Sequence, residues 1–541
     1  MKKNKLISCL LVSLMSTTII GCDKNNNSNN SGDNNKSKDV VLDVNNIKGE
    51  LEKNDDGTFN IEYLEGVEVD LWSVVGDPDK YFLEELVKKF NSQYAGSVKI
   101  NLTSHSEEVY YNNLETKYLH NFESFPDACL MHNEVNIEYA LRGFFYPLNT
   151  IIERTGVEFN FDNAYDNIER TTIYNNDHFG IPIDAHGYLT NIRQDIIKKN
   201  NLGFDDNTRF IPKTAAEYQS LLENLRSVAD SGELWVRNIN ADFDHTWYQL
   251  KTGNPKLKES VTKDTFRPTF MQTTEFDGLS ALYVNGGSLL DEKGNVNFQN
   301  CKGFERYITD QVDRYNNRLM GGGLKTSLFG PGNNVMFAEG PWWVANTYSL
   351  NWNNNQLGKV GERGITEEDA NDPVYRYPYA VARPENWWAT EDAPQETASK
   401  WYGNGHVITV SKKVTDIEKA AAILFFTQWL TQGQDKSGEY NLTTWCKGGG
   451  HVPAWQNVYE STGYQNAKEQ SMTLKALGDP KDIIALESTK HATELILGLS
   501  RSVSDVHALL ESNQGCTVTQ AQQILQEVAI GTQITLDLIT E

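Results

Sequence analysis

Cysteine is scarce in this sequence, and the cysteines stand far from one another. The chain of 541 residues has 6 cysteines, of which those after Cys22 are Cys129, Cys301, Cys446 and Cys516. No CxxC pair occurs, so a disulfide scaffold is excluded, and a zinc site made from closely spaced ligand pairs has no support. We expect buried free thiols, with one long-range disulfide as the alternative.

An excess of basic residues and long apolar runs are also missing. The chain has 49 basic and 73 acidic residues, a formal net charge of -24. This balance argues against nucleic-acid binding, which needs a basic surface. The mean hydropathy of -0.53 excludes a polytopic membrane protein. The motifs GxSxG, HExxH and the P-loop do not occur, so acyl transfer, zinc proteolysis and nucleotide hydrolysis have no signal.

The composition is that of a folded protein with more than one core. Hydrophobic residues make up 39% and aromatic residues 11% of the chain. Disordered chains are poorer in both. Because a single core rarely grows past roughly 250–300 residues, we expect two lobes or more.

The N-terminus has the layout of a secretory signal. Lys2, Lys3 and Lys5 precede a short apolar run over 6–20, and Gly21 then stands before Cys22. This segment resembles a bacterial lipoprotein box, which implies cleavage before Cys22 and lipidation of its thiol. The alternative is an ordinary secretory signal with an incidental cysteine. We predict a signal peptide over 1–21 and a lipidated Cys22 with a flexible tether over 22–61, because 23–39 lacks core-forming residues.

Strand and helix patterns alternate after the tether. Strand patterns over 67–75, 97–105 and 125–133 are separated by helical patterns from Asp79 to Phe90 and over 107–122. This β-α-β-α-β order predicts a parallel sheet, and ligands of such sheets bind beyond the carboxyl ends of the strands. The residues expected at those ends are Trp72, Ser73, His105, His132, Asn133 and Glu134. Later, Thr214 with Glu217 and Thr415 with Glu418 predict helix caps, the second opening an amphipathic helix over 414–431.

Several segments together resemble one family of binding proteins. They are LW at 71–72, YPL at 146–148, GIPIDAHGYLTNIRQDIIKKNNLG at 180–203, PKTAAEYQSLLENL at 212–225, VMFAEGPWWVAN at 335–346, GNGHVITVSKKVTDIEKAAAILFFTQWLT at 403–431 and GGGHVPAW at 448–455. Their order and spacing resemble the extracellular solute-binding proteins of ABC importers, in the carbohydrate-binding, maltose-binding-protein-like family. The likeness covers most of 62–541.

The resemblance implies an α/β, two-lobed, periplasmic-binding-protein-like fold with hinge strands and a central ligand cleft. The expected N-terminal lobe is 62–183 plus 404–450, and the expected C-terminal lobe is 184–403 plus 451–541. The chain would cross between the lobes near 182–187, 403–407 and 446–452. Glycines at 187, 403, 405 and 448–450 stand where a hinge needs backbone freedom.

Sugar binding needs aromatic platforms for C–H faces and polar groups for hydroxyl edges. The resemblance implies that the tryptophan after Gly340 stacks on sugar, so Trp342 and Trp343 are candidates, one of which is expected to be core. Trp72 at a strand end is a second platform or a packing residue. Trp387 is a third platform or a loop anchor.

The polar candidates lie at strand ends and lobe crossings. Asp184 matches an acidic ligand-contact position of the family, with a hinge or cap role as the alternative. The other candidates are His132, Asn133 and Glu134, with capping of the next helix as the alternative, and His186, with the role of a structural histidine as the alternative. Asn404 and His406 at the second crossing and His105 after the second strand complete the set. His178 and His186, eight residues apart across a Gly-Ile-Pro break, are not expected to form a metal pair. We predict no catalytic residue, metal or cofactor.

The combined expectation is a lipid-anchored extracellular solute-binding protein that delivers a sugar or oligosaccharide to an ABC permease. Its partners would be the carbohydrate, the permease and, through the lipid anchor, the outer face of the cytoplasmic membrane of a Gram-positive cell; a monomer is expected and nucleic acid is not. The alternatives are a secreted glycoside hydrolase, which needs two carboxylates about 5–9 Å apart, a binder of peptides or another polar solute, and a surface adhesin or scaffold.

Overall fold

A computed structural model describes residues 44–77, 79–240, 243–257, 260–271, 276–322, 326–341, 359–486, 489–512 and 514–540. The predicted signal peptide, the predicted lipidation of Cys22 and the candidates Trp342 and Trp343 lie outside the described residues. None of the helices in the described ranges combines the length and apolar character that a membrane span requires.

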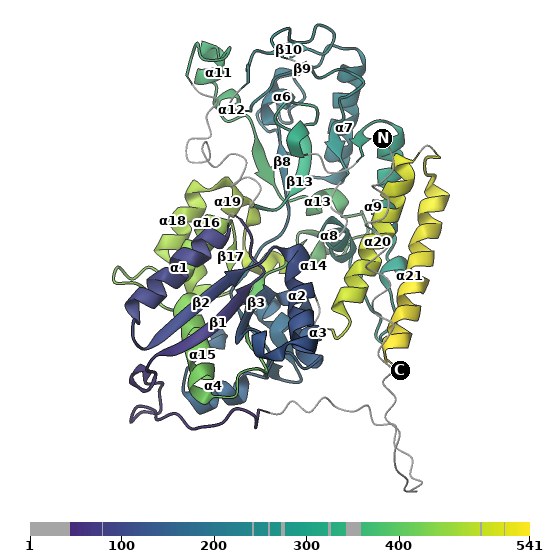
Figure 1. Ribbon diagram of the computed structural model, residues 1–541. Coiled ribbons are helices and arrows are strands. Elements are labelled where there is room, and N and C mark those ends of the chain that lie inside the picture. Colours follow the sequence, from purple (N-terminus) through teal and green to yellow (C-terminus); the bar gives the residue numbers. More distant parts are fainter. Residues whose placement is uncertain are drawn as a thin grey trace, which may run out of the picture. The chain divides into compact units, whose positions relative to one another are not determined.

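The first sheet confirms the predicted alternation of strands and helices. Strands β1 (Val67–Ser73), β2 (Val98–Ser104) and β3 (Ala128–His132) are parallel, and the sheet order is β2-β1-β3-β16-β6. β16 (His406–Val410) pairs antiparallel with β3 on one side and with β6 (Ile181–Pro182) on the other, so β16 alone runs against the rest. Trp72 is in register with Thr103 on β2 and Cys129 on β3. The carboxyl ends of β1, β2 and β3 therefore lie along one edge (Figure 1).

Helices with apolar stripes accompany these strands. Helix α1 (Asp79–Gln93) buries Leu83, Leu86, Val87 and Phe90, the three-and-four spacing of one helical face. Helix α2 (Glu107–His120) buries Tyr110 and Leu114 in the same way.

Helix α15 (Ile417–Thr431) differs from the prediction in its cap and its faces. Its N-cap is Asp416, whose side chain accepts from the backbone N–H of Glu418 at 2.8 Å, and not Thr415. Its residues are buried nearly all round, including Ala420–Leu424. The predicted amphipathic helix is therefore wrong: α15 is a core helix that contacts β1, β16 and α4 (Asn149–Thr155).

The predicted tether boundary at residue 61 is also wrong. Ile47 and Leu51 are buried in the larger hydrophobic core of the protein. Arg154 donates to the backbone oxygens of Ile47 at 3.1 Å and Gly49 at 3.0 Å. Residues 44–61 are thus part of the folded region, and only 22–43 of the predicted tether lies outside the described residues.

The second sheet has the order β12 (Met320–Gly321), β11 (Thr269–Phe270), β13 (Met336–Glu339), β8 (Leu189–Ile192) and β14 (Ala380–Ala382). β13 ends before Gly340 and Pro341, where the sequence predicts a break. Nearby helix α7 (Ala215–Asp230) begins after Thr214, whose Oγ1 accepts from the N–H of Glu217 at 3.1 Å. The Glu217 carboxylate accepts from the backbone N–H of Lys213 and not from that of Thr214, so the reciprocal bond of a capping box does not form.

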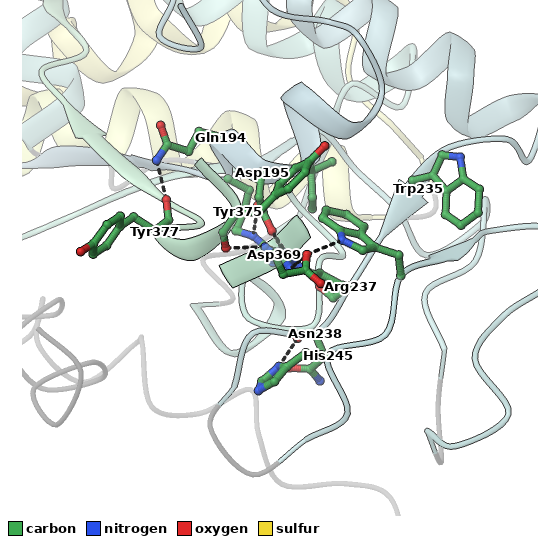
Figure 2. A network of polar contacts seen from close by, with 12 residues as sticks. Gln194, Asp195, Trp235, Arg237, Asn238, His245, Asp369, Tyr375 and Tyr377 are labelled. Carbon is green, nitrogen blue, oxygen red and sulfur yellow. Dashed lines mark hydrogen bonds and ion pairs between the residues drawn. The ribbon is translucent and has the colours of Figure 1, made fainter. Parts of the chain in front are cut away.

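Buried ion pairs tie the second lobe together. Arg193 and Asp195, at the end of β8 and in α6 (Gln194–Lys199), pair at 2.8 Å, and Arg237 bonds to Asp195 at 2.8 Å and to Asp369 at 2.7 Å. Burial alone would raise the pKa of Asp195, but the two guanidinium groups hold that pKa below its ordinary value. Figure 2 shows Arg237 between the two carboxylates.

The remaining larger elements complete both lobes. They are α3 (Asn136–Leu141), α8 (Phe276–Val284), α9 (Lys302–Asn316), α11 (Glu367–Asn371), α12 (Pro373–Arg376), α13 (Glu385–Trp388), β15 (Trp401–Tyr402), α16 (Asn441–Gly449), α18 (Thr462–Gln470), α19 (Met472–Leu477), β18 (Ile483–Ile484), α20 (Ala492–Glu511) and α21 (Val518–Thr540). Helices α20 and α21 lie side by side at the end of the chain and contact α9 (Figure 1). Cys129, Cys301, Cys446 and Cys516 are free thiols, as expected, and all except Cys301 are buried.

Short pairings connect the two sheets where the sequence predicts lobe crossings. β7 (Asp184–Ala185) pairs antiparallel with β17 (Val452–Pro453), and His186 bridges to Asn404. Glycine is required here because there is no room for a Cβ atom, as well as for its backbone flexibility. A Cβ at Gly187 would collide with the ring of Trp401, and one at Gly405 with the backbone oxygen of Asp184. Close backbone approach thus explains both glycines.

Candidate functional site

Two aromatic side chains meet at the carboxyl edge of the first sheet. The rings of Trp72, at the end of β1, and His105, just after β2, lie 4.6 Å apart edge to face. The backbone N–H of His105 donates to the carbonyl of Ser73 at 2.9 Å, which fixes the pair. Both side chains are half-buried. The pair can therefore offer an apolar face to a ligand, and the buried Nε2 atom of His105 is a polar atom that lacks a partner among the described residues.

His132 and Glu134 extend this edge from the end of β3. The Nδ1 atom of His132 hydrogen-bonds to the hydroxyl of Tyr111 at 3.1 Å. The hydroxyl of Tyr402 donates to Oε2 of Glu134 at 2.8 Å. Burial lowers the pKa of His132 well below its ordinary value, so its ring is neutral at pH 7. Tyr111 and Tyr402 were not predicted from the sequence, because neither follows the carboxyl end of one of the first three strand patterns or stands in a family motif.

Asn133 and Asn404 are buried and hold backbone groups. The side chain of Asn133 donates to Oγ1 of Thr171 at 3.1 Å and accepts from the N–H of Gly405 at 3.1 Å. Asn404 exchanges backbone hydrogen bonds with His186 at 2.8 and 2.7 Å. The side chain of Asn133 and the backbone of Asn404 are thus engaged within the protein, and a ligand contact of Asn133 or Asn404 stays a prediction.

Asp184 is the centre of a buried polar cluster at the crossings. Its Oδ1 accepts from the backbone N–H of His406 at 2.9 Å and lies 3.0 Å from His406 Nδ1. Its Oδ2 accepts from the indole N–H of Trp445. Burial alone would raise the pKa of Asp184, but His406 and His451 hold it well below its ordinary value. The carboxylate is fully buried, which fits its hinge alternative.

Two further histidines complete this cluster. His186 Nδ1 lies 3.8 Å from Asp184 Oδ1, and burial lowers the pKa of His186 to about 4. His451 lies between two carboxylates, with Nε2 3.0 Å from Asp79 and Nδ1 3.7 Å from Asp184. Burial alone would lower the pKa of His451, but the two carboxylates raise it. His451 was missed as a site residue, although it stands inside the GGGHVPAW segment at the third crossing.

The candidate tryptophans of the second lobe have different positions. Trp387 is buried, stacks on Tyr218 at 4.7 Å and donates to the carbonyl of Pro212 at 3.0 Å. These contacts match its anchoring alternative, and we do not keep it in the site. Trp342 and Trp343 lie outside the described residues. The residue before them, Pro341, lies next to the third crossing, since a Cβ at Gly450 would be 2.7 Å from its ring.

The arrangement separates two kinds of residue. Trp72, His105, His132 and Glu134 are half-buried at the strand ends, where a ligand can be reached. The buried set is Asn133, Asp184, His186, Asn404, His406 and His451, which joins the crossing segments. The half-buried residues can bind a polar solute that also has apolar faces. The buried residues hold the crossing segments together.

Comparison with solved structures places the chain in a class by its fold, the two-lobed periplasmic-binding-protein fold. The chain matches the GacH receptor of Streptomyces glaucescens over 86% of its length and 98% of that chain, with a TM-score of 0.58 and 13% identity. It matches maltose-bound MalE3 of T. maritima over 87% of its own length and 100% of that chain, with a TM-score of 0.58 and 17% identity. It matches UgpB of Mycobacterium tuberculosis, in complex with glycerophosphocholine, over 88% of its own length and 100% of that chain, with a TM-score of 0.62 and 11% identity.

At identities of 11–17% the likeness establishes the fold and does not establish which ligand this protein binds. No protein-family model and no curated protein matches the sequence. The predicted fold class is confirmed, with the first sheet, the second sheet and the connecting pairings as its parts.

Proposed function

We propose that this protein is the solute-binding component of an ABC importer and that it captures a sugar or an oligosaccharide. The observation that carries the proposal is the fold, which matches structures of proteins that hold acarbose or maltose across nearly their whole length. The half-buried strand-end residues support it, because ligands of open α/β sheets bind at this edge.

The contacts that we assign to the ligand combine stacking with polar groups. Trp72 offers an apolar ring, and His105, His132 and Glu134 offer polar atoms at the same edge. Sugars need both kinds of group, since their C–H faces are apolar and their edges carry hydroxyls. We keep Trp342 or Trp343 as a stacking residue, because the resemblance of the segment 335–346 implies a tryptophan on the sugar at this position.

The transport role follows from closure of the lobes. A ligand that contacts both lobes only in the closed form shifts the equilibrium toward that form. The closed form would dock on a membrane permease, and ATP hydrolysis on separate subunits would drive release. The lipobox-like segment supports anchoring through Cys22 on the outer face of the cytoplasmic membrane. In this role the protein binds its ligand without chemical turnover.

A second candidate ligand is a glycerophosphodiester, because the match to UgpB with glycerophosphocholine has a TM-score of 0.62. Such a ligand carries an anionic phosphate, which favours cationic donors. The lowered pKa of His132 leaves its ring neutral at pH 7, and the net charge of -24 repels anions at long range. These features favour the uncharged sugar.

The test is a calorimetric titration of the purified protein with maltose, maltotriose, glycerophosphocholine and a tripeptide, with chromatography of each mixture. Saturable binding of a sugar with no new product is the expected result. Binding of glycerophosphocholine or the peptide alone would replace the sugar in the proposal. A hydrolysis product from a sugar would contradict the binding role and favour a glycoside hydrolase.

The double variant Trp342→Ala, Trp343→Ala tests the stacking assignment. Loss of a stacked indole should weaken sugar binding at least about 10-fold, while thermal unfolding stays cooperative. Tyr63→Ala, which removes an exposed aromatic ring near the amino end of β1, should leave the affinity unchanged. Equal affinities of the double variant and the parent would refute the assignment.

A further inference from the structure

We infer that Asp184, His186, His406 and His451 form a zinc-binding site at the hinge. One ligand atom of each residue lies within 4.8 Å of those of the others, and all four side chains are buried. The residues come from β7, from the bridge between His186 and Asn404, from the first position of β16 and from the turn before β17. The inference is independent of the sugar that the protein binds.

The contacts of His451 provide the second line of evidence. Its Nε2 lies 3.0 Å from Oδ2 of Asp79. An ionised carboxylate only accepts hydrogen bonds, so Nε2 carries a proton, and the ring presents a lone pair at Nδ1 whenever that second nitrogen is unprotonated. This Nδ1 is fully buried and has no hydrogen-bond partner among the described residues.

The group that faces this lone pair is also an acceptor. His451 Nδ1 lies 3.7 Å from Oδ2 of Asp184, which is too long for a hydrogen bond. Two acceptors that face each other in a buried site leave a place for a cation. Ligand atoms around a tetrahedral zinc ion are separated by roughly 3.3 Å, because each is about 2.0–2.1 Å from the metal. The separations of 3.0, 3.8 and 3.7 Å between Asp184 oxygens and the three histidines are close to this value.

The groups around the ligands hold them as the partners of a metal site do. Asp79 fixes the tautomer of His451, as carboxylates do for histidines on zinc. The indole N–H of Trp445 and the backbone N–H of His406 hold the Asp184 carboxylate. Three imidazoles and one carboxylate suit zinc and its neighbours in the first transition row, whereas calcium and magnesium prefer oxygen ligands alone.

A metal here would join all the described crossing segments through one ion. Each ligating nitrogen must be free of its proton, so the affinity for zinc should fall as the pH is lowered. The competing occupant of the same space is a proton on His451 Nδ1, which would give an imidazolium between two carboxylates.

The experiment uses untagged protein that has been stripped with EDTA and dialysed. Zinc content is measured by mass spectrometry after exposure to Zn²⁺, and Co²⁺ is added separately to record the visible absorption of a tetrahedral cobalt centre. We expect one zinc per chain, a tetrahedral cobalt spectrum and a higher unfolding temperature with zinc, because a ligand of the native state stabilises it.

Variants separate the site from adventitious binding. His451→Gln should reduce zinc affinity about 100-fold or more, and Asp79→Asn, which changes only the positioning residue, about 10–100-fold. His178→Gln, a histidine paired with Glu169 in the first lobe, should keep the parent affinity. Circular dichroism checks that each variant is folded.

The parent protein alone can overturn the inference. Zinc content no higher than that of the EDTA-treated blank, or a cobalt spectrum of the octahedral aqueous ion, would assign the space to the proton on His451. Sugar affinity is measured on the same samples, so failure of the zinc site and failure of the proposed function are read separately.

Discussion

His406 and Asp184 are 222 positions apart in the chain, yet His406 Nδ1 lies 3.0 Å from Asp184 Oδ1 in the buried centre of the hinge. The same carboxylate oxygen accepts from the backbone N–H of His406 at 2.9 Å. The Asp184 carboxylate thus binds both the main chain and the side chain of His406, the first residue of β16. The pair joins the first crossing to the second.

Asp184→Asn should destabilise the metal-free protein by about 3 kcal/mol, because it removes the charged partner of a buried pair and leaves donors poorly matched. Urea unfolding in EDTA measures the change. Asp55→Asn, at an exposed turn, should alter the free energy of unfolding by less than about 0.5 kcal/mol. A loss below about 1 kcal/mol at Asp184 would mean that the hinge does not depend on this carboxylate.

Gly405→Ala should destabilise the protein by about 1–3 kcal/mol, since the new Cβ would collide with the backbone oxygen of Asp184 and force the crossing segments apart. Gly531→Ala is the matched control. It stands inside α21, where a Cβ meets nothing within 4 Å. That change should stabilise by about 0.5–1 kcal/mol through helix propensity. Thermal unfolding of both variants gives the comparison, and equal effects would contradict the steric argument.

Arg237→Met should cost about 3–5 kcal/mol of unfolding free energy, because it leaves Asp369 and Asp195 buried with fewer donors. The guanidinium also donates to the carbonyl of Tyr375 at 2.7 Å (Figure 2). Arg306→Met, on the exposed side of α9, should change stability by less than about 0.5 kcal/mol. Denaturant titrations of both variants measure the free energy of unfolding. A loss for Arg237→Met no larger than that for Arg306→Met would show that the ion pairs are energetically neutral.

His507→Gln should make the protein less sensitive to acid. Burial lowers the pKa of His507 to about 4 in the folded state, whereas an unfolded histidine titrates near about 6.5. Between these values the unfolded chain binds a proton that the folded protein does not, so stability falls as pH drops from about 6.5 toward 4. The variant should lose about 1–3 kcal/mol less than the parent over this interval.

Urea unfolding at pH 7 and pH 4.5 measures this difference. His120→Gln, at the exposed end of α2, should retain the acid sensitivity of the parent. Identical pH dependence of the parent and His507→Gln would mean that the ring at position 507 accepts a proton in the folded state.

Local patterns predicted the first sheet well. Each strand from β1 to β3 is followed by a helix or turn that a few neighbouring residues specify, and parallel pairing follows from the order of those elements. The crossings were expected from motifs rather than from periodicity, and they stay a prediction. Helix α15 was misassigned, because a helix in the core meets neighbours on every side and its own sequence does not reveal them.

The sequence by itself determined the α/β class and the strand ends that carry Trp72, His105 and His132. Only the tertiary structure decided that Asp184 faces His406 and His451, that Trp387 is an anchor and that residues 44–61 are folded. The physical reason is range. Helix and strand periods arise from contacts between near neighbours, whereas the hinge cluster joins residues hundreds of positions apart, and no local pattern records those contacts.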